Sequence, residues 1–188
     1  RRLAAHDAVG SAAQARMLQK IGILTAAECK ALLGELQKIR EQAFRGEFTI
    51  PHQLEDCHTA IESVLTQRLG DLGGKIHTGR SRNDQVLLAM RLYLREQCVS
   101  RLEELAALVA VLRSRFDSIG EVPLPGYTHM QPAMPASIGM WLHAQAEAAL
   151  ELLRDGLSVL ERIDSNPLGA ASGFGVPLPL DREYVAEL

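Results

Sequence analysis

The chain has 188 residues, of which 47% are hydrophobic and only 4% aromatic, and its formal net charge is -3. This length and composition suffice for one ordinary domain that packs through aliphatic side chains. The slight negative charge and a pI near 6.1 exclude the basic footprint of a nucleic-acid-binding protein. We expect small molecules or other protein subunits as partners.

Cysteine spacing and hydropathy bear on metal binding, disulfide formation and membrane association. Cys29, Cys57 and Cys98 form no close-spaced metal-binding pair, and their odd number argues against a disulfide framework. Reduced thiols in the cytoplasm are the better interpretation. No apolar run approaches the ~18 residues of a membrane helix, so we expect no membrane partner. Both ends look cut, which predicts a fragment of a longer protein.

The sequence before residue 70 predicts three helices. The first covers residues 2–20, and Thr25 with Glu28 forms a capping box for a second that runs to about Ala43. The third begins near Glu55 and Asp56 and runs to residue 69. Apolar residues expected near one face of the first two helices are Val9, Ala13, Met17, Leu18, Leu32, Leu33, Leu36 and Ile39. His58, in the first turn of the third helix, is of a kind that more often caps a helix or lies on the surface.

A glycine-rich stretch, Gly73 to Gln85, follows these helices and reads Gly-Gly-Lys-Ile-His-Thr-Gly-Arg-Ser-Arg-Asn-Asp-Gln. Glycine allows positive φ and close approach of the backbone to a ligand. Asn83 and Asp84 are good N-caps for the following helix, whose first N–H groups attract anions. Arg80 and Arg82 add donors that suit carboxylate or phosphate. The stretch therefore predicts a site for a small carboxylate or phosphate, with a solvated basic turn as the alternative.

The same stretch has a superficial likeness to a nucleotide-binding loop. Residues 74–81 read Gly-x-x-x-x-Gly-Arg-Ser, one residue away from the phosphate loop of nucleotide hydrolases. That motif needs lysine in place of Arg80 and a buried strand just before it. Because the preceding segment is helical, the sequence argues against a nucleotide site.

Two long helices are predicted next, from about Asn83 to Ile119 and from Ser137 to Ile163. The first carries apolar residues at steps of three and four without glycine or proline, and would span roughly 50 Å at 1.5 Å per residue. A small domain on its own cannot bury the apolar side of so long a helix. Its near-heptad spacing predicts packing along other long helices, some of them from other copies of the chain.

A proline-rich segment, residues 121–136, joins the two long helices and holds Thr128, His129 and Gln131. Four prolines and a glycine make it stiff. A rigidly held histidine is a candidate proton donor or acceptor because its pKa lies near neutrality. A histidine that only hydrogen-bonds the loop to its neighbours is an equally good interpretation at this point. Residues 165–180 read as a connector that turns the chain back, and Asp181 caps a final helix.

Taken together, these motifs resemble the argininosuccinate lyase family of the fumarase and aspartase superfamily. The most specific are His-Thr-Gly-Arg-Ser-Arg-Asn-Asp at 77–84 and Gly-Tyr-Thr-His-Met-Gln at 126–131. Weaker matches are Gly-Ser at 10–11, Glu-Asp-Cys-His-Thr-Ala at 55–60 and Pro-Leu-Gly-Ala at 167–170. The resemblance covers nearly the whole chain but only the N-terminal part of such an enzyme.

The resemblance implies an all-α fold, a bundle of long helices of the fumarase/aspartase type that is cut before the rest of the central bundle and the C-terminal domain. Residues 1–82 would form the N-terminal helical region and 83–188 the first part of the central bundle. The implied reaction is the reversible β-elimination of argininosuccinate to arginine and fumarate in arginine biosynthesis, with no metal or organic cofactor. The implied assembly is a homotetramer whose sites are shared between subunits.

The resemblance also assigns roles to residues. His129 matches a catalytic acid or base, for which we favour proton donation to the leaving group. Positions matching the family's substrate-binding residues are Ser11, His58, Ser81, Arg82, Asn83 and Thr128. The family's third signature, a flexible loop with the serine thought to act as base, is absent from residues 1–188, so we expect this chain alone to be inactive.

Departures from the family pattern leave alternatives open. Gln14 and Met134 stand where relatives often have other residues, which puts the choice of substrate in doubt. One alternative is a sister lyase that acts on another succinyl compound. Another is a structural protein of the lens-crystallin kind, and a third is a binding module formed by the fragment itself.

Overall fold

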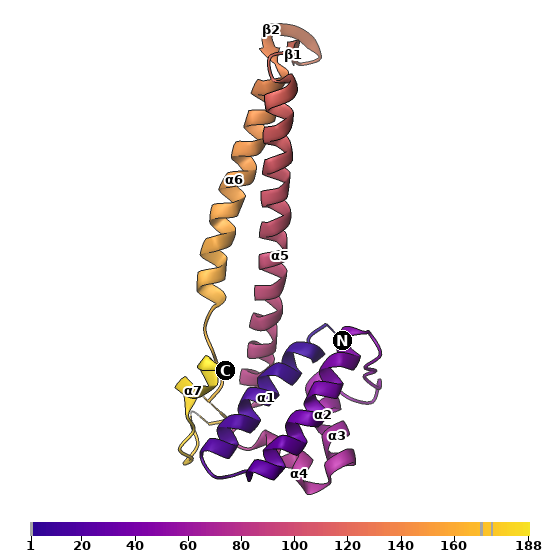
Figure 1. The fold of residues 1–188 in the computed structure, drawn as a ribbon, viewed down its shortest axis with the longest axis vertical. Coiled ribbons are helices and arrows are strands. Elements are labelled where there is room, and N and C mark those ends of the chain that lie inside the picture. The colour runs from indigo at the N-terminus through magenta and orange to yellow at the C-terminus, as the bar shows by residue number, and fades with distance from the viewer. Residues whose placement is uncertain (1, 170, 174) are drawn as a thin grey trace. The chain divides into compact units, whose positions relative to one another are not determined.

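The structure is a computed structural model that describes residues 2–169, 171–173 and 175–188. It forms two compact units, one of residues up to Leu94 together with Asp164–Leu188, and one of Arg95–Ile163. Both are mainly helical, which confirms the predicted class (Figure 1). The predicted division at residue 82 concerns the complete protein and stays a prediction.

The first unit is built from short and medium helices. It contains α1 (Ala4–Lys20), α2 (Ala26–Phe44), α3 (Cys57–Leu69), α4 (Asp71–Gly74), the 3-10 helix η1 (Lys75–His77), the beginning of α5 (Arg82–Ile119) and α7 (Arg182–Glu187). The predicted capping box is confirmed, because the Glu28 amide donates to Thr25 Oγ1 at 3.2 Å and the Thr25 amide donates to Glu28 Oε2 at 2.8 Å. The predicted cap of α7 is confirmed too: the Tyr184 amide donates to Asp181 Oδ1 at 3.0 Å.

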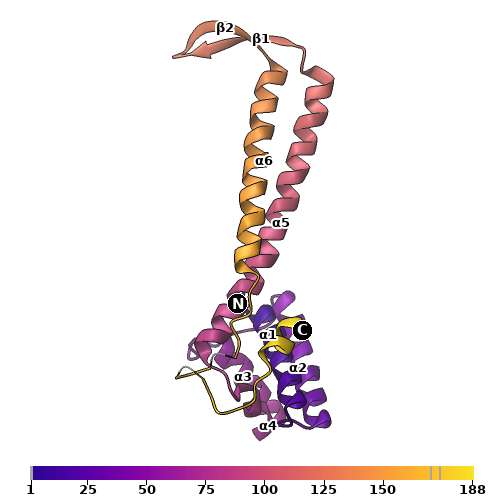
Figure 2. The same cartoon turned by 90° about the vertical axis from the view of Figure 1, so that its left-hand side faces the viewer.

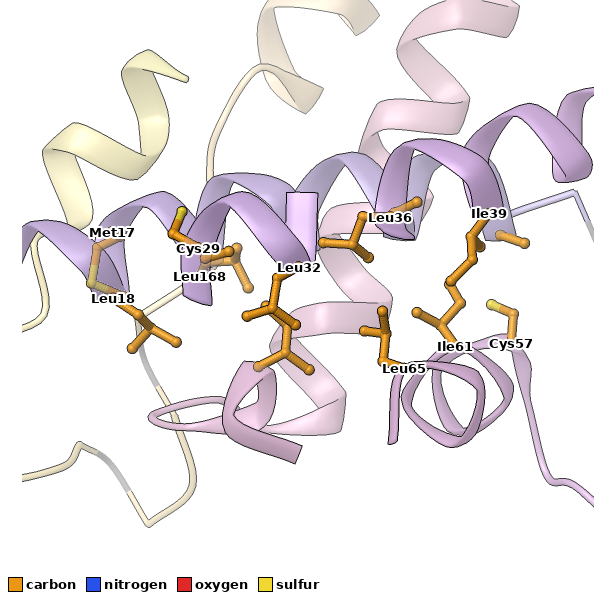
Figure 3. Close-up of a cluster of buried hydrophobic side chains, with 14 of the residues drawn as sticks. Met17, Leu18, Cys29, Leu32, Leu36, Ile39, Cys57, Ile61, Leu65 and Leu168 are labelled. Carbon is orange, nitrogen blue, oxygen red and sulfur yellow. The ribbon is translucent and has the colours of Figure 1, made fainter. Parts of the chain in front are cut away.

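The core of this unit lies between α1, α2 and α3 (Figure 3). Leu36 and Ile39 of α2 face Ile61 and Leu65 of α3, and all four side chains are almost fully buried. Leu168, from the segment between α6 and α7, is buried in the same cluster. The predicted connector is therefore anchored in the core, and it returns the chain to the unit formed by the first helices.

Helix α1 differs from its predicted pattern. Val9, expected near the apolar face, is 36% exposed, whereas the polar side chains of Asp7, Ser11 and Gln14 are almost fully buried. These three residues follow the spacing of one helix face. That face meets polar side chains from other segments, so polar partners and not apolar ones decide which side of α1 is buried.

The second unit consists of the rest of α5, the hairpin of β1 (Pro123–Thr128) and β2 (Gln131–Ser137), and α6 (Ile138–Ile163). Within this unit α5 and α6 run side by side (Figure 2). Gly120 and Gly139 allow a close backbone approach: the Gly139 amide donates to the Gly120 carbonyl at 3.0 Å, and a Cβ on Gly139 would lie 2.8 Å from that oxygen. Nearer the other end, the Cys98 thiol lies 3.6 Å from the Gly156 carbonyl oxygen.

Many large apolar side chains of the second unit are exposed. On α5 and α6 they are Val99, Leu108, Val111, Phe116, Ile119, Met140, Trp141, Leu150, Leu152, Leu157 and Val159. Such a surface on long helices agrees with the sequence-based expectation of an uncovered apolar flank. Among the described residues, no helix is both long and apolar enough to cross a membrane.

The hairpin is the main element that the sequence did not predict. Prolines are depleted in strands because they cannot donate a ladder hydrogen bond, yet Pro123 and Pro125 lie in β1 and Pro132 and Pro135 in β2. Both strands of a two-stranded ribbon are edges, where proline is tolerated. The pairing is antiparallel, with an irregularity between Pro125 and Tyr127.

Candidate active site

The glycines of the central stretch serve the fold itself. Gly73 packs against α3, where an added Cβ would lie 2.3 Å from the backbone nitrogen of Thr66. The close approach expected at a ligand is thus made to a helix. Gly79 has a φ of 68°, the positive value that favours glycine. A Cβ on it would lie 3.0 Å from Leu180 Cδ2, so the turn also packs against the segment before α7.

Helix α5 begins at Arg82 and is capped by Ser81, one position earlier than predicted. The Asn83 amide donates to Ser81 Oγ at 3.2 Å, and the Ser81 amide donates to Asp84 Oδ1 at 2.9 Å. This reciprocal pair replaces the predicted caps at Asn83 and Asp84. The second oxygen of Asp84 accepts from the Ala171 amide at 3.0 Å. Ser81 is half-buried and Asn83 exposed, so both side chains are accessible beside the first turn of α5.

Arg80 is not available to a ligand, contrary to the sequence-based expectation. Its side chain is 1% exposed, its Nη1 donates to Ser11 Oγ at 3.0 Å, and its Nη2 lies 3.9 Å from Asp7 Oδ1. Burial lowers the pKa of this guanidinium, and the charges of Asp7, Asp84 and Glu62 oppose that shift. Arginine stays cationic in proteins. Arg80 and Ser11 therefore belong to a buried polar network.

Arg82 joins the first turn of α3 to the first turn of α5. Its Nη2 donates to Thr59 Oγ1 at 3.0 Å, its Nη1 contacts the Glu55 carboxylate, and its Nε lies 3.5 Å from Asp56 Oδ2. Hydrogen bonding to Glu55 and the charge of Asp56 raise the pKa of Arg82. The start of α3 is in turn capped by Asp56, which accepts from the Thr59 amide at 2.8 Å. The two helix starts are thus held together.

His58 is neither a cap nor a surface residue, as a lone histidine at this position more often would be. It is 5% exposed, and its Nδ1 lies 2.9 Å from Asp7 Oδ1 in an ion pair. Burial lowers the pKa of His58, but the Asp7 carboxylate and the neighbouring Cys57 outweigh this and raise it to about 10. His58 is therefore an imidazolium at neutral pH, next to the segment that holds Arg82.

Thr128 and His129 lie at the tip of the hairpin in the second unit, whereas the other predicted site residues lie in the first. Thr128 pairs with Gln131, so His129 and Met130 form a two-residue turn. Both have positive φ, 50° and 62°, as type I′ hairpin turns require. Non-glycine residues adopt this conformation at a cost, which is typical of functional positions. The side chains of Thr128, His129 and Met130 are exposed.

Residues 1–188 match the Lyase family over their whole length. The chain belongs to this family. It is 45% identical to the argininosuccinate lyase of Phocaeicola vulgatus over 186 residues, which are 99% of this chain and 42% of that protein. It is 48% identical to the argininosuccinate lyase of Stenotrophomonas maltophilia strain K279a over 179 residues, 95% of this chain and 42% of that protein. The chain thus spans about two fifths of the length of these relatives.

Solved structures of the same fold place this lyase family chain among fumarase-like proteins. An EDDS lyase variant with bound fumarate matches with a TM-score of 0.83 and 27% identity, over 98% of this chain and 36% of that one. The class II fumarase of Schistosoma mansoni matches with a TM-score of 0.84 over 97% of this chain and 42% of that one. At 20% identity the second likeness shows the fold alone.

Two buried residues of this lyase family chain, Asp7 and Gln85, were not singled out by the sequence-based argument. Gln85 Nε2 donates to Asp7 Oδ1 at 2.8 Å, and both side chains are almost fully buried. A signal was present in α1: Asp7, Ser11 and Gln14 are spaced four and three residues apart in a segment otherwise rich in alanine. Polar residues at that spacing share one helix face. Gln14 accordingly donates to the Thr78 carbonyl at 2.8 Å.

One group of donors in the described chain has the composition of a metal site. Ligand atoms of Asp7, Cys57 and His58 lie within 4.8 Å of one another and are buried. However, His58 Nδ1 already faces Asp7, and the Arg80 guanidinium lies 3.9 Å from the same carboxylate. Two cations beside one carboxylate oppose the binding of a third. The arrangement is that of a buried ion-pair network.

Proposed function

We propose that the full-length protein is a carbon–nitrogen lyase that splits argininosuccinate reversibly into arginine and fumarate, as a step of arginine biosynthesis in the cytoplasm. The observation that carries this proposal is the 45–49% identity to argininosuccinate lyases along nearly the whole chain. The Ser81–Asn83 segment, part of the family-like motif at 77–84, lies at the start of a 38-residue helix, where an anionic substrate is favoured.

The substrate's carboxylates would bind at the start of α5. The hydroxyl of Ser81, the side-chain amide of Asn83 and the first-turn N–H groups that Ser81 does not cap are donors there, and Arg82 adds a partly exposed cation. His58 supplies a second positive charge from α3. Thr128 would complete the binding set from the hairpin. Ser11 is buried against Arg80 and would not contact the substrate. It would support the substrate-binding residues indirectly, by holding Arg80 in the buried polar network.

The elimination needs one base and one acid. A base removes the proton from the carbon next to a carboxylate, the bond from the neighbouring carbon to the guanidinium nitrogen breaks, and an acid returns a proton to that nitrogen. The products are fumarate and arginine, and the charge that gathers on the carboxylate is stabilised by donors already aimed at it. We assign the acid to His129, at the exposed tip of the hairpin. The base would be a serine of the family's third signature, which residues 1–188 do not contain.

The assembly follows from the same proposal. We infer a homotetramer in which the exposed apolar faces of α5 and α6 pack against other copies and each site combines segments from different subunits. The proton transfers and the stabilisation of the carboxylate charge described above need no metal and no organic cofactor. In this arrangement the Ser81 segment of one subunit and the His129 hairpin of another serve the same substrate.

Replacing His129 by Asn in the full-length enzyme tests the proposal. Loss of a positioned acid should lower kcat by about 10²–10⁴-fold, measured as fumarate formation by ultraviolet absorbance. His52→Asn is the matched control, because His52 is an exposed loop residue and its loss should leave turnover unchanged. Near-normal turnover of His129→Asn would refute the assigned proton transfer.

The competing activity is that of a sister lyase, since EDDS lyase shares this fold at 27% identity. The full-length wild-type protein should be supplied in parallel with argininosuccinate, adenylosuccinate and EDDS. A kcat/KM for argininosuccinate well above the other two would support the proposal. Preference for either of the others would replace it.

A further inference from the structure

Asp7 lies at the centre of the buried polar network of the first unit. One oxygen, Oδ1, accepts from Gln85 Nε2 at 2.8 Å, lies 2.9 Å from His58 Nδ1 and lies 3.9 Å from Arg80 Nη2. These partners come from α5, α3 and the loop before α5. Asp7, on α1, touches none of the exposed positions beside Ser81, yet it contacts all three segments that build that surface.

The charges explain why an acid occupies this position. Burying an unpaired charge is costly, so a buried cation persists only beside an anion. His58 is the second residue of α3, where the positive end of the helix dipole disfavours a further cation. Burial and the helix start would therefore both keep the imidazole neutral. Asp7 is the group that reverses this preference.

We propose that Asp7 is a positioning residue for His58: its carboxylate fixes the ring through Nδ1 and holds it as an imidazolium, so that Nε2–H is a charged donor for a carboxylate of the substrate. This inference rests on the proposed function, in which His58 lines the substrate site. The logic is that of other carboxylate–histidine pairs, where a buried acid sets the orientation and protonation of the ring.

The surroundings of His58 support the assignment. The charged or titratable groups around it are Asp7 from α1, Asp56 and the Cys57 thiol from the start of α3, and Arg80, which lies beside the same Asp7 oxygen. Of these, only Asp7 carries a negative charge that contacts the ring. Arg80 competes for the same carboxylate but from 3.9 Å, farther away than His58.

The first measurement uses the unmodified full-length protein. Labelling histidine at Cε1 with ¹³C and assigning His58 by its loss in His58→Gln gives its protonation state from the chemical shift as pH is raised. We expect the imidazolium to persist at pH 8, with titration near pH 10. A neutral ring at pH 7 would overturn the proposal, and this result does not depend on whether any Asp7 variant folds.

The second measurement uses Asp7→Asn, which keeps the shape of the side chain and removes its charge. The His58 resonance should then titrate at or below about pH 6.5, the ordinary value for histidine. KM for argininosuccinate at pH 8 should rise by about 10-fold or more, with a smaller change in kcat. Lowering the pH to 6 should restore part of the lost affinity, which a purely structural role of Asp7 would not produce.

Asp71→Asn is the matched control, since Asp71 is an exposed acid in the same unit. It should leave both the His58 titration and KM unchanged. An imidazolium that survives at pH 8 in Asp7→Asn, or an unchanged KM in that variant, would refute the positioning role. Failure of the proposed function shows separately, as absent turnover of argininosuccinate by the wild type, while the titration of His58 still decides the part that concerns Asp7.

Discussion

Arg80, in a basic loop that resembles a ligand site, serves the interior of the protein. Its guanidinium is held by the Ser11 hydroxyl and lies within 3.9 Å of Asp7, and two of its nitrogens, Nε and Nη2, have no hydrogen-bond partner among the described residues. The buried positive charge of Arg80 is therefore compensated mainly by the negative charge of Asp7 and less by hydrogen bonds. Its removal leaves Asp7 with His58 as the single facing cation.

Arg80→Met should therefore lower the free energy of unfolding of the full-length protein by about 3 kcal/mol, the cost of breaking a buried pair. The midpoint of urea-induced unfolding measures the change. Arg68→Met is the control: Arg68 pairs with Glu35 at 2.8 Å but is 38% exposed, so its loss should cost less than about 1 kcal/mol. Equal costs for the two variants would mean that the buried network contributes no more than a surface ion pair.

The candidate site residues could be chosen from the sequence, but their burial could not be predicted from it. The Ser81–Asn83 segment stands out because caps and cations precede a long helical pattern, which is local information. The roles of His58 and Arg80 depend on Asp7, 51 and 73 positions away in the chain. No local pattern encodes which cation meets a distant acid, so the local pattern assigned Arg80 to a ligand and favoured a cap or a surface position for His58.

At the scale of single elements, the start of α2 combines local and distant contacts. Thr25 and Glu28 cap each other, and Glu28 also accepts from Lys75 Nζ of η1 at 2.6 Å. These hydrogen bonds, led by the one from Lys75, lower the pKa of Glu28 to about 2. Glu28 of the capping box therefore also fastens η1, which lies within the glycine-rich stretch, to α2.

Thr25→Ala should destabilise the protein by about 1 kcal/mol, because it removes the side-chain acceptor of the Glu28 amide and leaves a helix donor unpaired. Thermal unfolding followed by circular dichroism gives the change. Ser63→Ala, at an exposed position inside α3, should be neutral or slightly stabilising because alanine favours helix. If the melting temperature of Thr25→Ala equals that of the wild type, the contact from Lys75, and not the cap, holds the start of α2.

The helices were predictable because their periodicity is strong and their caps are local. The hairpin was not, since four prolines and two non-glycine residues of positive φ contradict the usual signals of strand and turn. Its strands can pair because each strand of a two-stranded ribbon is an edge strand. A proline that lacks an N–H is tolerated where that side of the strand needs no hydrogen bond. The turn then places His129 at the tip, a position that residue statistics would give to Asn or Gly.

At the scale of the whole molecule, the second unit has too little chain to cover its own helices. The sequence predicted an uncovered flank from the length of α5, and the structure shows exposed apolar side chains along both α5 and α6. Periodicity indicates that such a face is buried in an assembly. It does not specify the partner, because any apolar surface of matching shape removes the same area from water.

The inferred homotetramer makes the apolar face of α6 a direct test. Leu152 and Val159 are 57% and 46% exposed and lie seven residues apart, on one side of the helix. Burying two carboxylates against apolar side chains is costly, so Leu152→Glu with Val159→Glu should convert the full-length tetramer to smaller species in sedimentation velocity. Thr66→Glu with Gln67→Glu adds the same charge to exposed positions of α3 and should leave the tetramer intact. A tetramer that survives the α6 substitutions would show that this stripe faces water in the assembly, and the shared site would then have to be built through other faces of the long helices.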